Sequence, residues 1–128
     1  MNIFYEPVNL MQWNMFEVVK SIGHEEPFLA TQAMEIGDCI LLHVGQQSKR
    51  YRSGVYAIGE VISTPAILDN RPNDYCNNKL SVWVRITRIN YSEPYIPHEA
   101  CKEFISQFRT VHKIEAQHYA KIHNLLEQ

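Results

Sequence analysis

The chain has 128 residues and a mass of 15.0 kDa, a length that predicts one domain large enough to bury its own core. Apolar residues make up 45% of the sequence and charged residues 20%, a composition typical of soluble globular domains. The longest uncharged apolar run, over 39–44, is too short to cross a membrane. Residues 1–6 carry neither the basic nor the long apolar stretch of a secretory signal.

Charge is unevenly distributed along the chain, although the formal net charge is only −2. Between Lys49 and Arg88 there are seven cations and three anions, whereas the remaining residues carry five cations and eleven anions. Such a chain is not a globally basic nucleic-acid binder, but it can present one basic face while staying near neutral overall.

The N-terminal residues predict a strand followed by a helix. Residues 2–5 form a short apolar strand, which we expect Glu6-Pro7 to end because proline cannot donate to a ladder. Apolar residues then recur with helical spacing over 10–22. Asn9 is suited to cap this helix, and Gly23 is suited to the position just after its end.

The central residues predict a β-hairpin with a basic tip. The pattern over 24–35 is irregular, and an apolar run over 39–44 then predicts a central strand. A polar loop over 45–54 carries the sequence Lys-Arg-Tyr-Arg at 49–52. Apolar side chains alternate over 55–62, so we expect this strand to pair with the preceding one.

The C-terminal half predicts a third strong strand and two helices. Residues 64–79 form a long Asn-, Asp- and Pro-rich loop, and the strand follows over 80–89. Pro97 is suited to the first position of a short helix, a last strand is expected at 110–112, and a final helix over 115–127. Because strands and helices do not alternate regularly, the order predicts an α+β domain with a mostly antiparallel curled sheet or small barrel flanked by helices.

Motif searches give no catalytic or metal signature. The five glycines form neither phosphate-binding pattern, and no G-x-S-x-G elbow is present. His118 and His123 are five residues apart on an expected helix, so their side chains diverge, and no H-E-x-x-H occurs. Three cysteines without a C-x-x-C pair predict reduced thiols in a cytoplasmic protein. We therefore predict no metal, no cofactor and no catalytic residue.

The strongest functional signal is a set of basic residues interleaved with aromatic ones. Cations neutralise phosphates and rings stack on bases, so the hairpin tip at 49–52 is suited to a nucleic-acid backbone. Trp83 and Arg85 share one face of the strand over 80–89. The alternative interpretation is that the cations only decorate a hairpin and that Trp83 packs under a helix. The residues predicted to contact the backbone are Lys49, Arg50, Tyr51, Arg52 and Arg85.

Several segments, taken in order, resemble the signature of EVE domains. The central match is the turn and apolar strand over Met34–Val44, followed after a polar loop by Gly54–Val61. Phe4–Pro7 is similar to the end of the family's first strand, and Leu80–Val84 to its Val-x-Val strand. Trp13, Ile96-Pro97, Phe108-Arg109 and the final helix also match in order and spacing.

The resemblance covers nearly the whole chain and implies one domain over 1–128 with a PUA-like fold, a curled mixed β-barrel flanked by helices. EVE domains are related to YTH domains and are thought to read modified bases in DNA or RNA. The resemblance therefore implies a stand-alone, monomeric, non-enzymatic module that binds a modified nucleobase in an aromatic-lined pocket.

In the EVE family the residues just after the first strand line the pocket, and the resemblance assigns the matching positions of this chain to the same role. Many members follow the first helix with Trp-Gly, where this chain has Ile22-Gly23, so the usual pocket Trp is missing and His24 or Phe28 is a substitute. The long loop that supplies another wall contains Tyr75. The base pocket implied by the resemblance comprises Tyr5, Glu6, Asn9, Ile22, Gly23, His24 and Tyr75.

Two other functions stay open from the sequence. Some PUA-like proteins of ASCH type resemble hydrolases of modified nucleosides; this chain lacks their G-x-K-x-x-E-x-R pattern, and Lys49, Glu60 and Thr64 are the residues to test. The third function is a protein-interaction module of a defence or toxin system, for which an exposed apolar patch around Trp83 is the expected mark.

Overall fold

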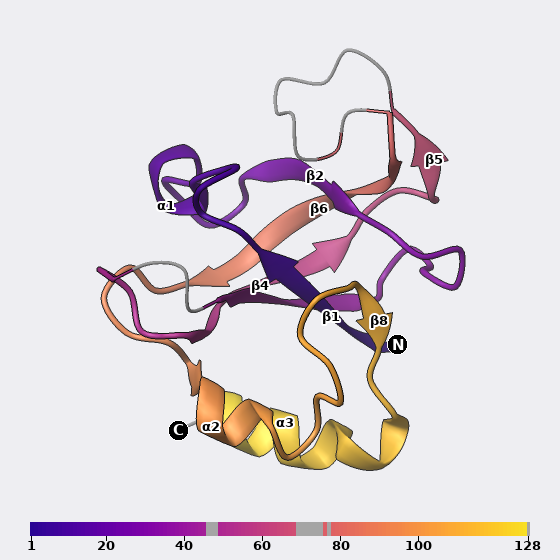
Figure 1. Cartoon of the computed structure of the whole chain (residues 1–128). Helices are drawn as coiled ribbons and strands as arrows, with labels where there is room; N and C mark the ends of the chain where they lie inside the picture. Colours follow the sequence, from indigo (N-terminus) through magenta and orange to yellow (C-terminus); the bar gives the residue numbers. More distant parts are fainter. Residues whose placement is uncertain (46–48, 69–75, 77, 128) are drawn as a thin grey trace.

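A computed structural model describes residues 1–45, 49–68, 76 and 78–127. In this part of the chain, eight strands form one strongly curled mixed sheet, with short helices packed outside it (Figure 1). The expected α+β class with a curled sheet is confirmed. The strands are β1 (Ile3–Val8), β2 (Glu25–Leu29), β3 (Cys39–Val44), β4 (Gly54–Val61), β5 (Ala66–Ile67), β6 (Leu80–Ile89), β7 (Ile96–Pro97) and β8 (His112–Lys113).

The strand order is β2-β6-β4-β3-β1-β8, with β5 paired to β6 and β7 paired to β4. Strand β1 runs parallel to β3, and the other pairs are antiparallel. The predicted hairpin between 39–44 and 55–62 is confirmed as β3 and β4, and the predicted strand over 80–89 is β6. These three strands have the strongest strand signals in the sequence, either a continuous apolar run or a strict alternation of apolar and polar residues.

Strand β1 does not end at Glu6-Pro7 as predicted but continues to Val8. The carbonyl of Ile3 accepts a hydrogen bond from Ile114 on the β8 side, and alternate residues of a strand face the same edge. Pro7 therefore faces that edge, beyond the pairs that β8 makes with Phe4 and Tyr5. The missing N–H of Pro7 costs no ladder hydrogen bond there, which is why the strand tolerates it.

The prediction of a helix over 10–22 is wrong, because α1 covers only Met15–Val18. Asn14, not Asn9, is its N-cap, and the Oδ1 of Asn14 accepts a hydrogen bond from the N–H of Phe16 at 3.1 Å. Asn9 instead closes a turn. Gly23 has a φ of +95° but follows no helix, and its N–H donates to the carbonyl of Ile86 at the start of the β2–β6 pairing.

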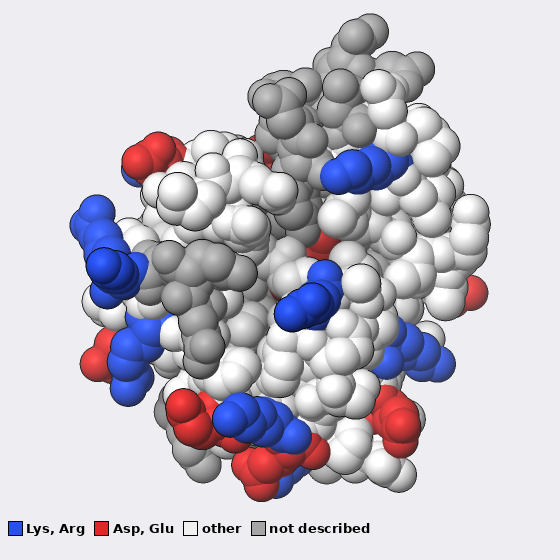
Figure 2. Space-filling view, in the orientation of Figure 1, with Lys and Arg blue, Asp and Glu red and all other residues white. Residues whose placement is uncertain are grey.

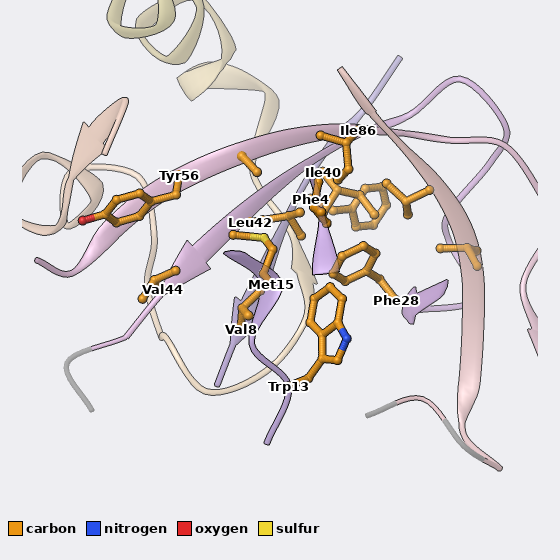
Figure 3. Packing of buried hydrophobic residues seen from close by; sticks show 14 of the residues in the cluster. Phe4, Val8, Trp13, Met15, Phe28, Ile40, Leu42, Val44, Tyr56 and Ile86 are labelled. Atoms are coloured by element: carbon orange, nitrogen blue, oxygen red, sulfur yellow. The ribbon is translucent and has the colours of Figure 1, made fainter. Parts of the chain in front are cut away.

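The prediction that 24–35 is irregular is wrong for Glu25–Leu29, which forms β2 against β6. A Glu-Glu-Pro sequence is a poor strand signal, but β2 lies at the edge of the sheet, where proline is tolerated. Phe28 on this strand packs edge-to-face against Trp13, with ring centroids 5.4 Å apart. Figure 3 shows both rings pointing into the buried cluster inside the curled sheet.

The C-terminal helices cover the outside of the sheet. Pro97 is the N-cap of α2 (His98–Cys101) rather than its first residue. The strand expected at 110–112 lies later, as β8, and shares only His112 with the prediction. The final helix begins as a 3-10 turn at Ala116–His118 and continues as α3 (Tyr119–Leu126). Helices α2 and α3 lie together under the sheet (Figure 1) and cover a second buried cluster. No helix among the described residues is long and apolar enough to span a membrane.

Candidate functional site

An open pocket of about 620 Å³ lies where the ends of β1 and β3 meet the segment after α2. We call it the histidine pocket, since two histidines from distant parts of the chain line it. Polar or aromatic side chains that line it include those of Asn9, His43, Ser53, His98, Phe108 and Arg109. A register shift between Leu42 and His43 interrupts the β3–β4 ladder at this point. Irregularities of this kind commonly re-aim a side chain next to a functional site.

A second hollow, of about 430 Å³, adjoins this pocket at the tip of the β3–β4 hairpin. We call it the basic hollow, because Lys49, Arg50 and Arg52 line it and are all exposed. Ser53 and His98 line both hollows and therefore form the boundary between them. Figure 2 shows Lys and Arg side chains spread over several parts of one face, and acidic side chains together with basic ones along the edge that α2 and α3 occupy in Figure 1.

Strand pairing holds the two boundary residues side by side. Gly54 pairs with Pro97, and the N–H of His98 donates to the carbonyl of Ser53 at 3.0 Å. This close approach requires glycine at 54, because a Cβ there would lie 2.5 Å from the carbonyl oxygen of Ile96. The boundary is therefore built on paired backbone.

A chain of hydrogen bonds runs behind the boundary. The hydroxyl of Tyr5 donates to the carbonyl of Phe108 at 2.8 Å and lies 3.3 Å from Nδ1 of His43. Nε2 of His43 lies 3.3 Å from Nδ1 of His98 and 3.5 Å from Oγ of Ser53. The hydroxyl of Ser53 donates to the carbonyl of Val44 at 2.9 Å. The polar groups at this end of the pocket are thus fixed by one another.

His43 is almost completely buried, with 2% of its surface exposed. Burial, together with the nearby His98, lowers the pKa of His43 to about 4. The imidazole of His43 is therefore neutral at physiological pH. Burial also raises the pKa of Tyr5, whose hydroxyl stays protonated. His98 is only half-buried and packs against Phe108, with ring centroids 4.5 Å apart.

The aromatic residue of the hairpin tip is turned toward the core. Tyr51 is half-buried, and its ring stacks on Phe16 with centroids 4.2 Å apart and planes 24° apart. The guanidinium of Arg50 lies 5.3 Å from the centre of the same ring. Tyr51 therefore anchors the tip and orients Arg50, and the ring best placed to line a ligand pocket is Phe108.

The structure places the residues expected in a base pocket in different regions. Asn9 lines the histidine pocket, and Tyr5 lies directly behind it. Glu6 is fully buried on the opposite face of β1 from Tyr5. Ile22, Gly23 and His24 lie in the turn before β2 and do not line the histidine pocket, while Tyr75 lies outside the described residues.

The structure also separates the other residues predicted to form a site. Arg85 lies on β6, where it pairs with Glu25 at 3.1 Å and Glu60 at 3.9 Å rather than lining the basic hollow. Glu60 lies near one end of β4 and Lys49 precedes the other end, so the length of the strand from Gly54 to Glu60, about 20 Å, lies between them. The residues suggested for a hydrolase are therefore not brought together. Trp83 is half-buried.

Sequence reasoning missed His43, Ser53, His98 and Phe108 as site residues. The one available signal was a histidine inside the apolar run over 39–44, where a polar side chain needs partners. No disulfide joins Cys39, Cys76 and Cys101. In the described ranges, no group of three or more His, Cys, Asp or Glu is arranged to hold a metal ion.

Comparisons with known proteins show the fold alone. No protein-family model matches the chain, and no curated protein matches it. A hypothetical protein from Leishmania major is 14% identical with a TM-score of 0.66, over 99% of this chain and 95% of that one. An NMR structure from Rhodopseudomonas palustris is 13% identical with a TM-score of 0.65, over 99% and 94% of the two chains. A crystal structure from Pseudomonas syringae is 11% identical with a TM-score of 0.66, over 97% and 99%.

Proposed function

We propose that this chain is a nucleic-acid-binding module of EVE, PUA-like type, which takes one unstacked modified base into the histidine pocket. The observation that carries the proposal is the shared boundary: the histidine pocket and the basic hollow meet at Ser53 and His98. A nucleotide has the same order of parts, with a base and a charged phosphate joined through a sugar. The two hollows therefore match a base on one side and the strand's phosphates on the other.

The contents of each hollow suit these roles. Phe108 offers a half-buried ring, and Asn9 offers an amide that can both donate and accept hydrogen bonds. Lys49, Arg50 and Arg52 are exposed cations with room for phosphate oxygens. Because these cations are few, we expect phosphate contacts alone to bind weakly at physiological salt and the base to add the remaining affinity.

The proposal includes a monomeric protein that acts in the cytoplasm without a cofactor. The cytoplasmic location, a reducing compartment, is supported by Cys76 and Cys101, which are buried, form no disulfide, and have a pKa that burial raises to about 12. Protonated, inaccessible thiols of this kind serve packing rather than redox chemistry or metal binding.

Binding to the phosphate backbone is tested with Arg50→Ala. Fluorescence anisotropy of short single-stranded DNA and RNA probes, at salt concentrations of about 50 and 200 mM, gives the affinity and its salt slope. Arg50→Ala should weaken binding to all sequences and lower the slope by about 0.7 for one lost phosphate contact on a single strand. Lys121→Ala, which removes an exposed cation of α3, is the matched control and should bind like the wild type. An unchanged affinity and slope in Arg50→Ala would exclude this role.

Base recognition is tested with paired probes that carry a modified or an unmodified base. Wild-type protein should prefer one modified probe at both salt concentrations, since stacking and apolar contact are screened little by salt. Phe108→Leu keeps an apolar side chain but removes the ring, and it should reduce that preference while leaving the salt slope unchanged. Equal binding of all probes by the wild type would contradict base recognition.

The hydrolase alternative is less well supported by the geometry. The hydroxyl of Ser53 lies 3.5 Å from Nε2 of His43, but its proton is donated to the carbonyl of Val44, so His43 does not activate it. The assay that separates the two functions is incubation of modified nucleosides with a high concentration of the protein. Product formation would favour the enzyme, and its absence would favour the binding module.

A further inference from the structure

The direction of the hydrogen bonds around His43 can be derived from the carbonyl groups at both ends of the chain. A carbonyl oxygen only accepts, so the single proton of the Tyr5 hydroxyl is committed to Phe108. The contact of 3.3 Å between Tyr5 and Nδ1 of His43 then requires the proton on Nδ1. A neutral imidazole carries one N–H, so Nε2 of His43 holds a lone pair.

The same reasoning fixes the two boundary residues. The proton of Ser53 is committed to the carbonyl of Val44, so Oγ offers only lone pairs to any other group. The hydrogen bond at 3.3 Å between the two histidines must therefore be donated by Nδ1 of His98. Neutral His98 is left with its lone pair on Nε2. Both boundary side chains are thus hydrogen-bond acceptors.

His43 maintains this arrangement because it does not gain a proton easily. It is 2% exposed, and burial holds its pKa near 4, well below physiological pH. Its Nε2 stays an acceptor, and the ring cannot turn over without breaking the bond to Tyr5. Tyr5 does not itself line either hollow, so it acts on the boundary only through His43.

We propose that Ser53 and His98 accept a hydrogen bond from the 2′-hydroxyl of the bound nucleotide, so that the site selects RNA over DNA. This inference rests on the proposed function. A base in the histidine pocket and a phosphate in the basic hollow place the connecting sugar at the boundary, since the sugar lies between the two in the covalent chain. A ribose 2′-hydroxyl can donate there, whereas deoxyribose offers only a C–H.

The test uses short single-stranded probes that differ only in the 2′ substituent of the nucleotide carrying the preferred base. Hydroxyl and amino groups can donate a hydrogen bond, whereas hydrogen and fluorine cannot. Fluorine favours the same sugar pucker as hydroxyl, so it separates donation from sugar shape. We expect the hydroxyl and amino probes to bind about fivefold more tightly than the hydrogen and fluorine probes, the effect of one added neutral hydrogen bond.

Two variants test whether the preference for a 2′ hydrogen-bond donor depends on Ser53 and His98. Ser53→Ala removes one acceptor and should reduce the ratio of hydroxyl to fluorine affinity. Tyr5→Phe removes the acceptor of the His43 Nδ1 proton, so the histidine pair can adopt the opposite tautomers and His98 can present a donor. The same ratio should fall in Tyr5→Phe, although the pocket lining is unchanged. Thermal melting of each variant confirms that it is folded, and Lys121→Ala is again the control.

The outcomes are distinct. A preference for donor substituents that falls in both variants supports the inference. Binding that weakens in Arg50→Ala but is equal for hydroxyl, hydrogen and fluorine probes overturns the ribose contact and leaves the proposed function standing. Loss of any measurable binding in the wild type overturns both.

Discussion

The burial of His43 predicts a specific dependence of stability on pH. The unfolded chain binds a proton at this residue with the ordinary histidine pKa of 6.5, whereas burial lowers the pKa of the folded protein to about 4. The unfolded state therefore binds more protons between these two values. Stability is fully present above pH 6.5 and is lost as the pH falls toward 4.

The magnitude follows from the two pKa values. Linkage over the interval from pH 7 to pH 5 gives a loss of about 2 kcal/mol in the free energy of unfolding from this one group. The full shift corresponds to about 3 kcal/mol, and the whole of it is lost only below pH 4. Little of this is reduced by solvent screening, because the ring is 2% exposed. For a domain of this size the loss is a large fraction of the total stability.

The measurement is urea unfolding followed by tryptophan fluorescence at several pH values between 5 and 7.5. His43→Gln removes the titrating ring but keeps a polar side chain, and its free energy of unfolding should vary less with pH than that of the wild type. His123→Gln, which replaces an exposed histidine of α3, is the matched control and should follow the wild type. If His43→Gln and wild-type protein show the same pH slope, the reasoning about the buried ring is refuted.

Three further predictions concern the frame of the site. Gly54→Ala should lower the free energy of urea unfolding by about 2 kcal/mol and weaken probe binding, because its Cβ would lie 2.5 Å from the carbonyl oxygen of Ile96. A variant with the wild-type free energy of unfolding and the wild-type affinity would contradict the close strand contact. Phe28→Ala should cost about 3–5 kcal/mol in the same assay, because the ring is fully buried. Cys76 and Cys101 should resist a thiol reagent at pH 8 until the chain unfolds in guanidinium chloride; rapid labelling of both in the native protein would show that burial does not protect them.

The strands that could be predicted are those whose own residues determine them. Apolar runs and alternation specify β3, β4 and β6 without reference to the rest of the chain. Strand β2 was missed because its Glu-Glu-Pro sequence is a poor strand signal and its pairing with β6 decides its conformation. The helix over 10–22 was predicted too long because apolar spacing was read as one helical face. In the structure Met15 and Val19 of this pattern are buried, but Met11 and Ile22 are exposed.

The candidate site could be predicted only in part. The basic tip at 49–52 is visible in the sequence because its residues are adjacent. The histidine pair is not, since His43 and His98 are 55 residues apart and meet only through the β4–β7 register. The direction of the hydrogen bonds cannot be predicted from the sequence either, because it depends on where the folded chain places the carbonyls of Phe108 and Val44. A cluster of adjacent basic residues can thus be predicted from the sequence, whereas the tautomers of the two histidines can be assigned only from the folded structure.

The position of β1 in the sheet has a consequence for how the protein is made. This strand is the first along the chain, yet Ile3 pairs with Cys39 and Phe4 pairs with Lys113, close to the C-terminal end of the sequence. A ribosome must therefore synthesise the chain as far as Lys113 before β1 has partners on both sides. Contacts between residues so far apart slow folding relative to a helical bundle of similar size. The nascent chain thus carries β1 incompletely paired until Lys113 has been added, an interval in which aggregation and chaperone binding compete with folding.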